Sequence, residues 1–284
     1  MENFSSQNNR PLLAFFLIAF GFSWFFWLFD VLNSLQVIQL PFSYMVFFAI
    51  GANGPLVAAL VMSWRLGGWA EVKRLIRSGF NLHMKFIWWF LIFLIPIVIS
   101  AVCLWINVSQ NGFQFDNSLL VQPLLIIPNF FIMFFIGGSV QEEFGWRGFA
   151  LPRLLKAWNP LVASLVLGLI WGMWHLPLFF IQGTGQYYMP MGIFLVMTIA
   201  FTLLFTWFYL RTGDNLFSAL LFHTTLNTFL GVFPPIEKVV GGNQLGMTYL
   251  MFAYGILALA VVILEKNLFT KKGLGVLQYS SPKV

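Results

Sequence analysis

The stretch FIWWFLIFLIPIVISAVCLWI, residues 86–106, contains no charged residue and decides the fold class. A helix of about 20 apolar residues spans the hydrocarbon core of a bilayer. PLLAFFLIAFGFSWFFWLF, residues 11–29, is of the same kind. The 284-residue chain is 60% hydrophobic and 8% charged, whereas soluble domains carry roughly 25% charged residues. The sequence therefore predicts an all-α polytopic membrane protein, with residues 1–284 forming a single transmembrane domain.

Eight stretches are long and apolar enough to span the membrane. We expect the spans at residues 11–32, 42–64, 86–107, 127–155, 160–181, 190–211, 214–232 and 246–265. With these spans, fourteen of the fifteen Lys and Arg residues lie on one side or on stretches leading to it, and only Lys238 lies on the other. Basic loops face the cytoplasm. We therefore expect an integral protein of the plasma membrane with both termini inside, including a cytoplasmic tail at 266–284.

The connection RLGGWAEVKRLIRSGFNLHMKF, residues 65–86, is basic and amphipathic. Such a segment is expected to lie on the membrane surface beside anionic lipids. The net charge of +6 is ascribed to cytoplasmic segments of this kind, so the expected partner is the lipid bilayer and not nucleic acid. GANGP, residues 51–55, predicts a close helix contact and a kink, and Cys103, the single cysteine, excludes a disulfide within the chain.

The segment QEEFGWR, residues 141–147, places three charges inside the fourth predicted span. Glu142 lies eleven residues before Arg153, the expected cytoplasmic anchor, which is about 16 Å along a helix. Ionisable residues at such depth cost roughly 2.5–3.5 kcal/mol each and mark functional sites. The segment is therefore a candidate for chemistry within the bilayer.

Two of the three histidines are expected at a comparable depth. His175 follows Pro160, the first-turn proline of the fifth span, by about 22 Å. His223 follows Asp214, the expected cap of the seventh span, by about 14 Å. A lone membrane histidine more often makes a helix–helix hydrogen bond, but three polar positions at one depth predict a polar active site buried between helices.

Helical spacing places the two glutamates on different faces of their helix. Glu143 and Arg147 are four residues apart, so they share a helix face and can neutralise each other. Glu142 points about 100° away and has no partner in its own helix. A desolvated carboxylate of this kind suits general-base work on a water molecule.

The other two spans repeat the four-residue spacing. His223 and Asn227 lie in HTTLN, and Trp171 and His175 lie in WGMWH. Members of each pair share a helix face. The pattern therefore predicts one carboxylate that faces two imidazoles and an amide across three helices.

These three motifs, at residues 142–147, 171–175 and 223–227, resemble those of the CPBP family, also called the Abi family. EEFGWR fits E-E-x-x-x-R, WGMWH approximates F-x-x-x-H, and HTTLN fits H-x-x-x-N. The family comprises type II CAAX prenyl proteases and bacteriocin-processing or self-immunity proteins. The resemblance extends over a protease-like core at roughly 45–230.

The resemblance implies hydrolysis of a peptide bond inside the bilayer. The substrate would be a membrane-embedded or lipid-modified peptide, of the prenylated CAAX type or bacteriocin-like. By position, Glu142 would be the general base and His175 would orient or activate the water. The tetrahedral oxyanion would be stabilised by His223 and Asn227, because buried donors act most strongly there.

Supporting roles follow from the same resemblance. Arg147 would hold Glu143 and thereby set the helix face. Trp171 stands where the family pattern has phenylalanine, which keeps a large ring but could alter the pocket.

A zinc mechanism is the competing interpretation. Glu142, His175 and His223 could bind a metal whose water attacks the carbonyl. The H-E-x-x-H helix of the zincins is absent from the sequence. The metal-free mechanism, with no cofactor, is therefore favoured.

Two other classes of function stay open. The chain could be a non-catalytic membrane protein of the same family that confers immunity or binds a peptide, although every matched motif position is filled. It could also be a proton-coupled transporter, which would be expected to show internal repeats or broken helices around a midplane site. No repeat is apparent, so the transporter ranks last.

Overall fold

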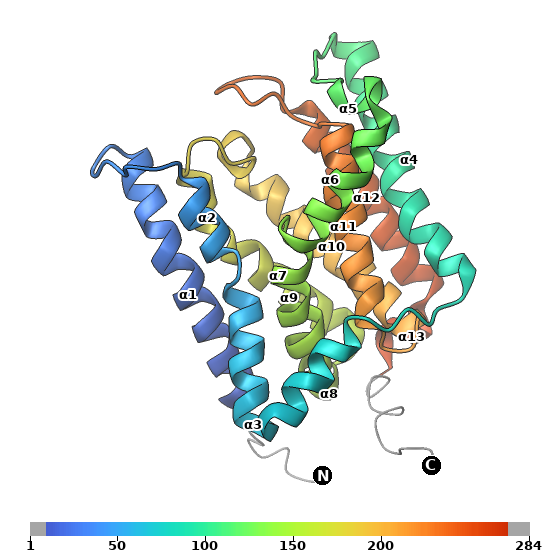
Figure 1. Cartoon of the computed structure of the whole chain (residues 1–284). Helices are drawn as coiled ribbons and strands as arrows, with labels where there is room; N and C mark the ends of the chain where they lie inside the picture. Colours follow the sequence, from blue (N-terminus) through green and yellow to red (C-terminus); the bar gives the residue numbers. More distant parts are fainter. Residues whose placement is uncertain (1–9, 272–284) are drawn as a thin grey trace.

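The structure, a computed structural model, describes residues 10–271 (Figure 1). All regular elements in these residues are helical. Seven α-helices have fifteen or more residues: α1 (Arg10–Ser34), α3 (Gly54–Ser78), α4 (Phe86–Asn111), α9 (Pro160–Trp174), α10 (Met191–Arg211), α11 (Leu216–Val232) and α12 (Leu245–Leu264). The shorter ones are α2 (Met45–Gly51), α5 (Ser118–Val121), α6 (Ile126–Phe135), α7 (Ser139–Gly145), α8 (Leu151–Ala157) and α13 (Lys266–Thr270). Turns of 3₁₀-helix cover Pro123–Leu125, Leu176–Phe180 and Gln186–Tyr188, and a π-helical turn covers Trp146–Ala150.

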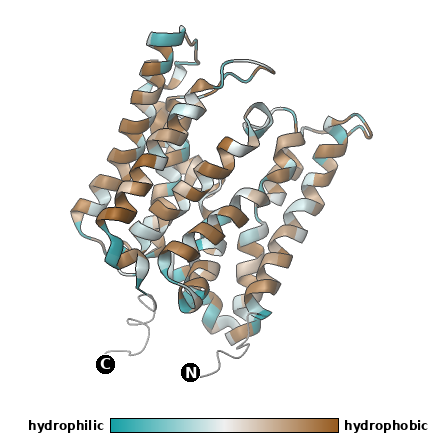
Figure 2. Cartoon of the chain, turned by 180° about the vertical axis from the view of Figure 1, so that it is seen from behind, coloured by the Kyte–Doolittle hydropathy of each residue, from teal (hydrophilic) through white to brown (hydrophobic). Residues whose placement is uncertain are grey.

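The predicted membrane fold is confirmed. Within the described residues, seven helical segments are long and apolar enough to cross a membrane, and α11 is a shorter apolar helix. Each of the eight predicted spans corresponds to one of these. Figure 2 shows hydrophobic residues along the helices and hydrophilic residues gathered mainly at loops and helix ends.

The second span is interrupted twice at glycines. The chain breaks between α2 and α3 at GANGP, where a Cβ atom on Gly54 would lie 2.1 Å from the Ser23 hydroxyl of α1. The predicted close contact and kink are therefore confirmed. A second kink falls at Gly68, whose φ of +63° is a left-handed value that glycine adopts readily. After it, residues 69–78 continue as a helix along one end of the bundle (Figure 1).

The fourth span is broken, where the sequence predicted a continuous helix over 127–155. The helix stops at Phe135, and α7 starts at Ser139 after Gly137 and Gly138. Gly138 has a φ of +108°, which residues with a side chain rarely adopt. The break therefore lies directly before the two glutamates, which stand on the short helix α7.

Helix α7 is packed tightly against its neighbours. A Cβ atom on Gly145 would lie 2.6 Å from the Pro55 carbonyl of α3, so the two helices approach to backbone contact. Helix α11 begins at Leu216, and the side chain of its N-cap Asn215 accepts a hydrogen bond from the Phe217 amide. The expectation that Asp214 caps this helix is therefore wrong. Asp214 has a φ of +58° and precedes the cap.

Candidate active site

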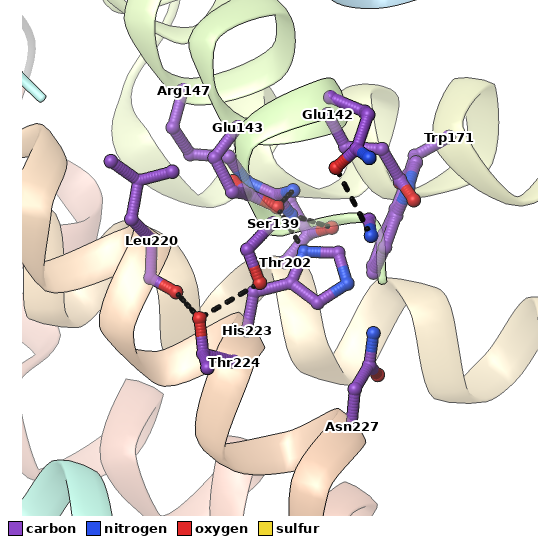
Figure 3. Close-up of polar contacts among 12 residues, drawn as sticks. Ser139, Glu142, Glu143, Arg147, Trp171, Thr202, Leu220, His223, Thr224 and Asn227 are labelled. Atoms are coloured by element: carbon purple, nitrogen blue, oxygen red, sulfur yellow. Dashed lines mark hydrogen bonds and ion pairs between the residues drawn. The ribbon is translucent and has the colours of Figure 1, made fainter. Parts of the chain in front are cut away.

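Glu143 is the centre of a buried charged network (Figure 3). Its Oε1 accepts hydrogen bonds from Arg147 Nη1 at 2.9 Å and lies 2.7 Å from His223 Nδ1. Arg147 Nη2 donates to the Thr202 hydroxyl on α10 at 2.9 Å. The predicted Glu143–Arg147 pair is confirmed, and it extends to two further helices.

The surroundings of Arg147 are aromatic. Its guanidinium carbon lies 3.9 Å from the centre of the Phe205 ring and 4.7 Å from the Trp171 ring, and the side chain is fully buried. Buried charges are stable only when they are paired and hydrogen-bonded. Arg147 therefore neutralises Glu143 and fixes its position.

Glu142 has a different environment from that of its neighbour. Of the described residues, only Trp171 donates a hydrogen bond to its side chain, from Nε1 to Oε2 at 2.5 Å (Figure 3). An indole N–H is a neutral donor. The carboxylate is thus held by a hydrogen bond while Oε1 is left for another ligand.

Both site histidines are held through Nδ1. His175 Nδ1 lies 2.8 Å from the Trp171 carbonyl oxygen, which can only accept, so Nδ1 carries the hydrogen. His223 Nδ1 is held in the same way by the Glu143 carboxylate. In each ring Nε2 is therefore the atom left for a ligand.

Gly138 opens a space between two of these groups. A Cβ atom placed on it would lie 2.8 Å from Glu142 Oε1 and 3.3 Å from His223 Nε2. Any side chain at this position would crowd both atoms, and all three residues line the same cavity. The missing side chain therefore leaves room for a small polar molecule beside both groups.

Asn227 secures the broken segment. Its Nδ2 donates to the Gly137 carbonyl at 2.7 Å, so one N–H satisfies the backbone at the break. The hydroxyls of Ser139 and Thr224 lie 2.9 Å apart and link α7 to α11 nearby. Asn227 therefore has a structural contact that the sequence did not predict.

The predicted site residues border one cavity of about 850 Å³. Glu142, Trp171, His175, His223 and Asn227 all line it, together with mainly apolar side chains. Glu143 and Arg147 do not line it and are fully buried. The site is therefore a polar patch in an apolar cavity, supported from behind by a charged network.

The side chains considered for a zinc site do not form a close group. Among residues 10–271, no three His, Cys, Asp or Glu side chains are grouped as a metal site requires. The Trp171 N–H also occupies Oε2 of Glu142. Glu142, His175 and His223 line one cavity without forming such a group, and the metal-free mechanism stays a prediction.

Three features were beyond sequence reasoning. The indole hydrogen bond of Trp171 was not foreseen, because Trp171 was considered only as a large ring. No sequence pattern pointed to Thr202 as a partner of Arg147. For Gly138, the only indication was its place in a pair of glycines just before the glutamates.

The fold and the site define a polytopic membrane protein with a carboxylate and two histidines in an internal cavity. The model of the Rce1-like family, type II CAAX prenyl endopeptidases, matches residues 123–229, which contain all three motifs. The chain is also 23% identical over 288 residues to CAAX prenyl protease 2 of Methanococcus maripaludis, covering 94% of this chain and 98% of that protein. The resemblance predicted from the three motifs is thereby confirmed: over residues 123–229 the chain is similar to the Rce1-like type II CAAX prenyl endopeptidases.

Proposed function

We propose that the protein is an intramembrane endopeptidase that hydrolyses a peptide bond in a membrane-associated peptide bound in the cavity. The family match and the name of the Methanococcus maripaludis relative support this class of activity. The apolar wall suits a substrate that is embedded in lipid or carries an apolar group.

The observation that carries the proposal is the environment of Glu142. The carboxylate faces an apolar cavity, is hydrogen-bonded by a neutral donor, and lies beside the space at Gly138. A base must lie within hydrogen-bond reach of the proton that it removes. A water in the cavity, hydrogen-bonded to Glu142 Oε1 beside Gly138, would meet this condition.

In the proposed reaction Glu142 removes a proton from this water. The water oxygen then bonds to the substrate carbonyl carbon, and His175 Nε2 accepts a hydrogen bond that orients the attack. When the tetrahedral intermediate collapses, the carbon–nitrogen bond breaks and Glu142 returns its proton to the leaving nitrogen. No metal takes part in these steps.

The oxyanion would be stabilised from α11. Asn227 uses one N–H for the Gly137 carbonyl and keeps its second for the oxyanion. His223 Nε2 would join it when the ring carries a second proton, with Glu143 holding Nδ1. Removing a donor of this type from an enzyme costs about 10²–10³ in kcat.

The test is peptide cleavage by purified wild-type protein and by Glu142→Gln. Loss of a general base lowers the rate by about 10²–10⁴, and Gln keeps the volume and an acceptor for the Trp171 indole. Glu237→Gln is the matched control, because Glu237 is an exposed acid at the cavity mouth.

Two results would contradict the proposal. Equal cleavage by Glu142→Gln and wild type would exclude Glu142 as the base. Peptide binding without cleavage by either protein would favour the non-catalytic immunity or peptide-binding function.

A further inference from the structure

A second, smaller pocket lies outside the active site. Its volume is about 250 Å³, and it shares no lining residue with the active-site cavity. Most of its walls come from α3 after the kink at Gly68, from the turn and helix that follow Arg147, and from the turn between α10 and α11. Pockets for drug-sized ligands measure about 300–1,000 Å³, so this one suits a small chemical group.

The pocket contains charges of both signs. Its charged lining residues are Glu71, Arg74, Arg153, Lys156 and Asp214. Arg74 and Glu71 form an ion pair with each other at 2.5 Å. Within the described residues, Arg153, Lys156 and Asp214 are in no ion pair. The lining thus leaves two cations and one anion for a ligand.

The two cations stand together on α8. Within the described part of the chain, the Arg153 side chain donates one hydrogen bond, from Nη1 to the Phe149 carbonyl at 2.8 Å, and its guanidinium carbon lies 3.5 Å from the centre of the Phe149 ring. A guanidinium has five N–H donors and binds phosphate oxygens in pairs, so most donors remain. Lys156 follows three residues later on the same helix face. This wall of the pocket therefore suits a phosphate.

Asp214 is the anion without a partner. Burial raises the pKa of its carboxyl to about 6, and no neighbouring charge or hydrogen-bond donor opposes this effect. An unpaired carboxylate of this kind costs stability in the free protein. A ligand that brings a cationic group to Asp214 would remove this cost.

The surroundings of the pocket suit a membrane–water interface. After the kink at Gly68, residues 69–78 run along one end of the bundle (Figure 1). Trp69 on this segment and Trp158, directly after α8, are exposed. Tryptophan is enriched at the level of the lipid headgroups. The molecules that such a pocket meets are therefore lipid headgroups.

From these observations we propose that the pocket binds the headgroup of an aminophospholipid, a phosphate diester that carries a primary ammonium group. The phosphate contacts Arg153 and Lys156, and the ammonium contacts Asp214. The ligand is thus a zwitterion, whereas the sequence predicted only anionic lipid along residues 65–86. The proposal goes beyond the endopeptidase function and does not depend on it, because no residue of the active-site cavity takes part.

Lipid binding by the purified full chain in detergent tests the proposal. Phosphatidylethanolamine and phosphatidylglycerol with the same acyl chains are titrated at pH 8, where Asp214 is ionised. Only the first lipid carries an ammonium group. Because a ligand that binds the folded state stabilises it, the rise in thermal midpoint measures binding.

The variants separate the two halves of the headgroup. Asp214→Asn removes the charge, and asparagine tolerates the left-handed φ of +58° at this position. We expect it to weaken phosphatidylethanolamine binding about tenfold, as for loss of a hydrogen bond to a charged group, and to leave phosphatidylglycerol binding unchanged. Arg153→Gln should weaken binding of both lipids. Asp116→Asn, at an exposed acid outside the pocket, is the matched control and should bind both as wild type does.

Three results would overturn the proposal. The first is equal affinity of Asp214→Asn and wild type for phosphatidylethanolamine. The second is unchanged binding of both lipids by Arg153→Gln and by Lys156→Gln, an exposed second variant in case the first folds poorly. The third concerns soluble phosphoethanolamine, which should bind far more weakly because it lacks acyl chains. Binding as tight as that of the lipid would overturn the assignment to a lipid.

Discussion

The two faces of helix α7 carry adjacent glutamates in opposite circumstances. Glu143 faces the protein interior, where it contacts Arg147 and His223. Glu142 faces the cavity, where it accepts a hydrogen bond from the neutral Trp171 indole. Glu143 is thus neutralised by an ion pair, whereas Glu142, the proposed base, has only a neutral donor.

The difference shows how a membrane protein can hold a buried carboxylate that has no ion pair. A buried ion needs a partner, so a single acid inside the bundle would be costly. Here the ion pair on the interior face fixes α7 and joins it to α10 and α11 through Thr202 and His223. Glu142 is then held by a fixed helix without having a cation of its own.

The largest effect on stability is expected when the Glu143–Arg147 ion pair on the interior face of α7 is removed. Glu143→Gln leaves Arg147 buried without its anion, and breaking such a pair costs about 3–5 kcal/mol. We expect a large fall in the thermal midpoint of the protein in detergent, with activity lost as a consequence. Glu142→Gln should leave the midpoint nearly unchanged. Similar melting of the two variants would contradict the division between the faces.

The double variant Glu143→Leu/Arg147→Met sharpens this test. Replacing both ions by apolar residues of similar size is often neutral or stabilising. Recovery of most of the lost stability is expected in the double variant. If the midpoint stays as low as in Glu143→Gln, the loss does not come from an unpaired arginine.

On the cavity face, Gly138→Ala should abolish most activity. The methyl group would occupy the space between Glu142 Oε1 and His223 Nε2, at 2.8 and 3.3 Å from them. A left-handed residue with a side chain also adds about 1–2 kcal/mol of strain. We expect kcat to fall by about 10²-fold, as for loss of a base. Gly231→Ala on the cavity wall is the control, and equal activity of both variants would contradict a water site at Gly138.

A smaller effect is expected for Trp171→Phe. This change keeps a ring and restores the family pattern, but it removes the N–H that holds Glu142. A hydrogen bond to a charged group contributes about 1.5–3 kcal/mol, so a fall in kcat of about tenfold or more is expected, with KM little changed. The pH profile of kcat should also move, because the hydrogen bond to the base is lost. An unchanged kcat and pH profile would show that the indole does not position Glu142.

The smallest effect concerns Asp214, which lies in the turn between α10 and α11. Burial raises the pKa of its carboxyl from 3.8 to about 6. Its ionisation is thus easier in the unfolded chain, so stability is retained at low pH and falls as pH rises from about 4 through 6. We expect Asp214→Asn to be more stable than wild type by about 1 kcal/mol at pH 7, allowing for solvent screening, and equal at pH 4. Thermal melts at both pH values measure the difference, and a gain independent of pH would contradict it.

The sequence predicted the membrane fold because apolar runs such as residues 86–106 are unambiguous in length and composition. Helical periodicity also placed Glu143 beside Arg147, since contacts four residues apart are local. The prediction of a continuous fourth span failed at Gly137 and Gly138, because the break there depends on packing against α11. The hydrogen bond between Trp171 and Glu142 joins residues 29 positions apart, so no local pattern could predict it.

The most direct test of the central claim measures metal content and cleavage in one preparation. Purified wild type, Glu142→Gln and His175→Ala are compared in detergent for bound zinc and for hydrolysis of a test peptide. We expect wild-type cleavage without stoichiometric metal, unaffected by chelators, and no cleavage by Glu142→Gln. About one zinc per active chain, as in a catalytic zinc site, lost in both variants, would contradict it and make Glu142 a ligand.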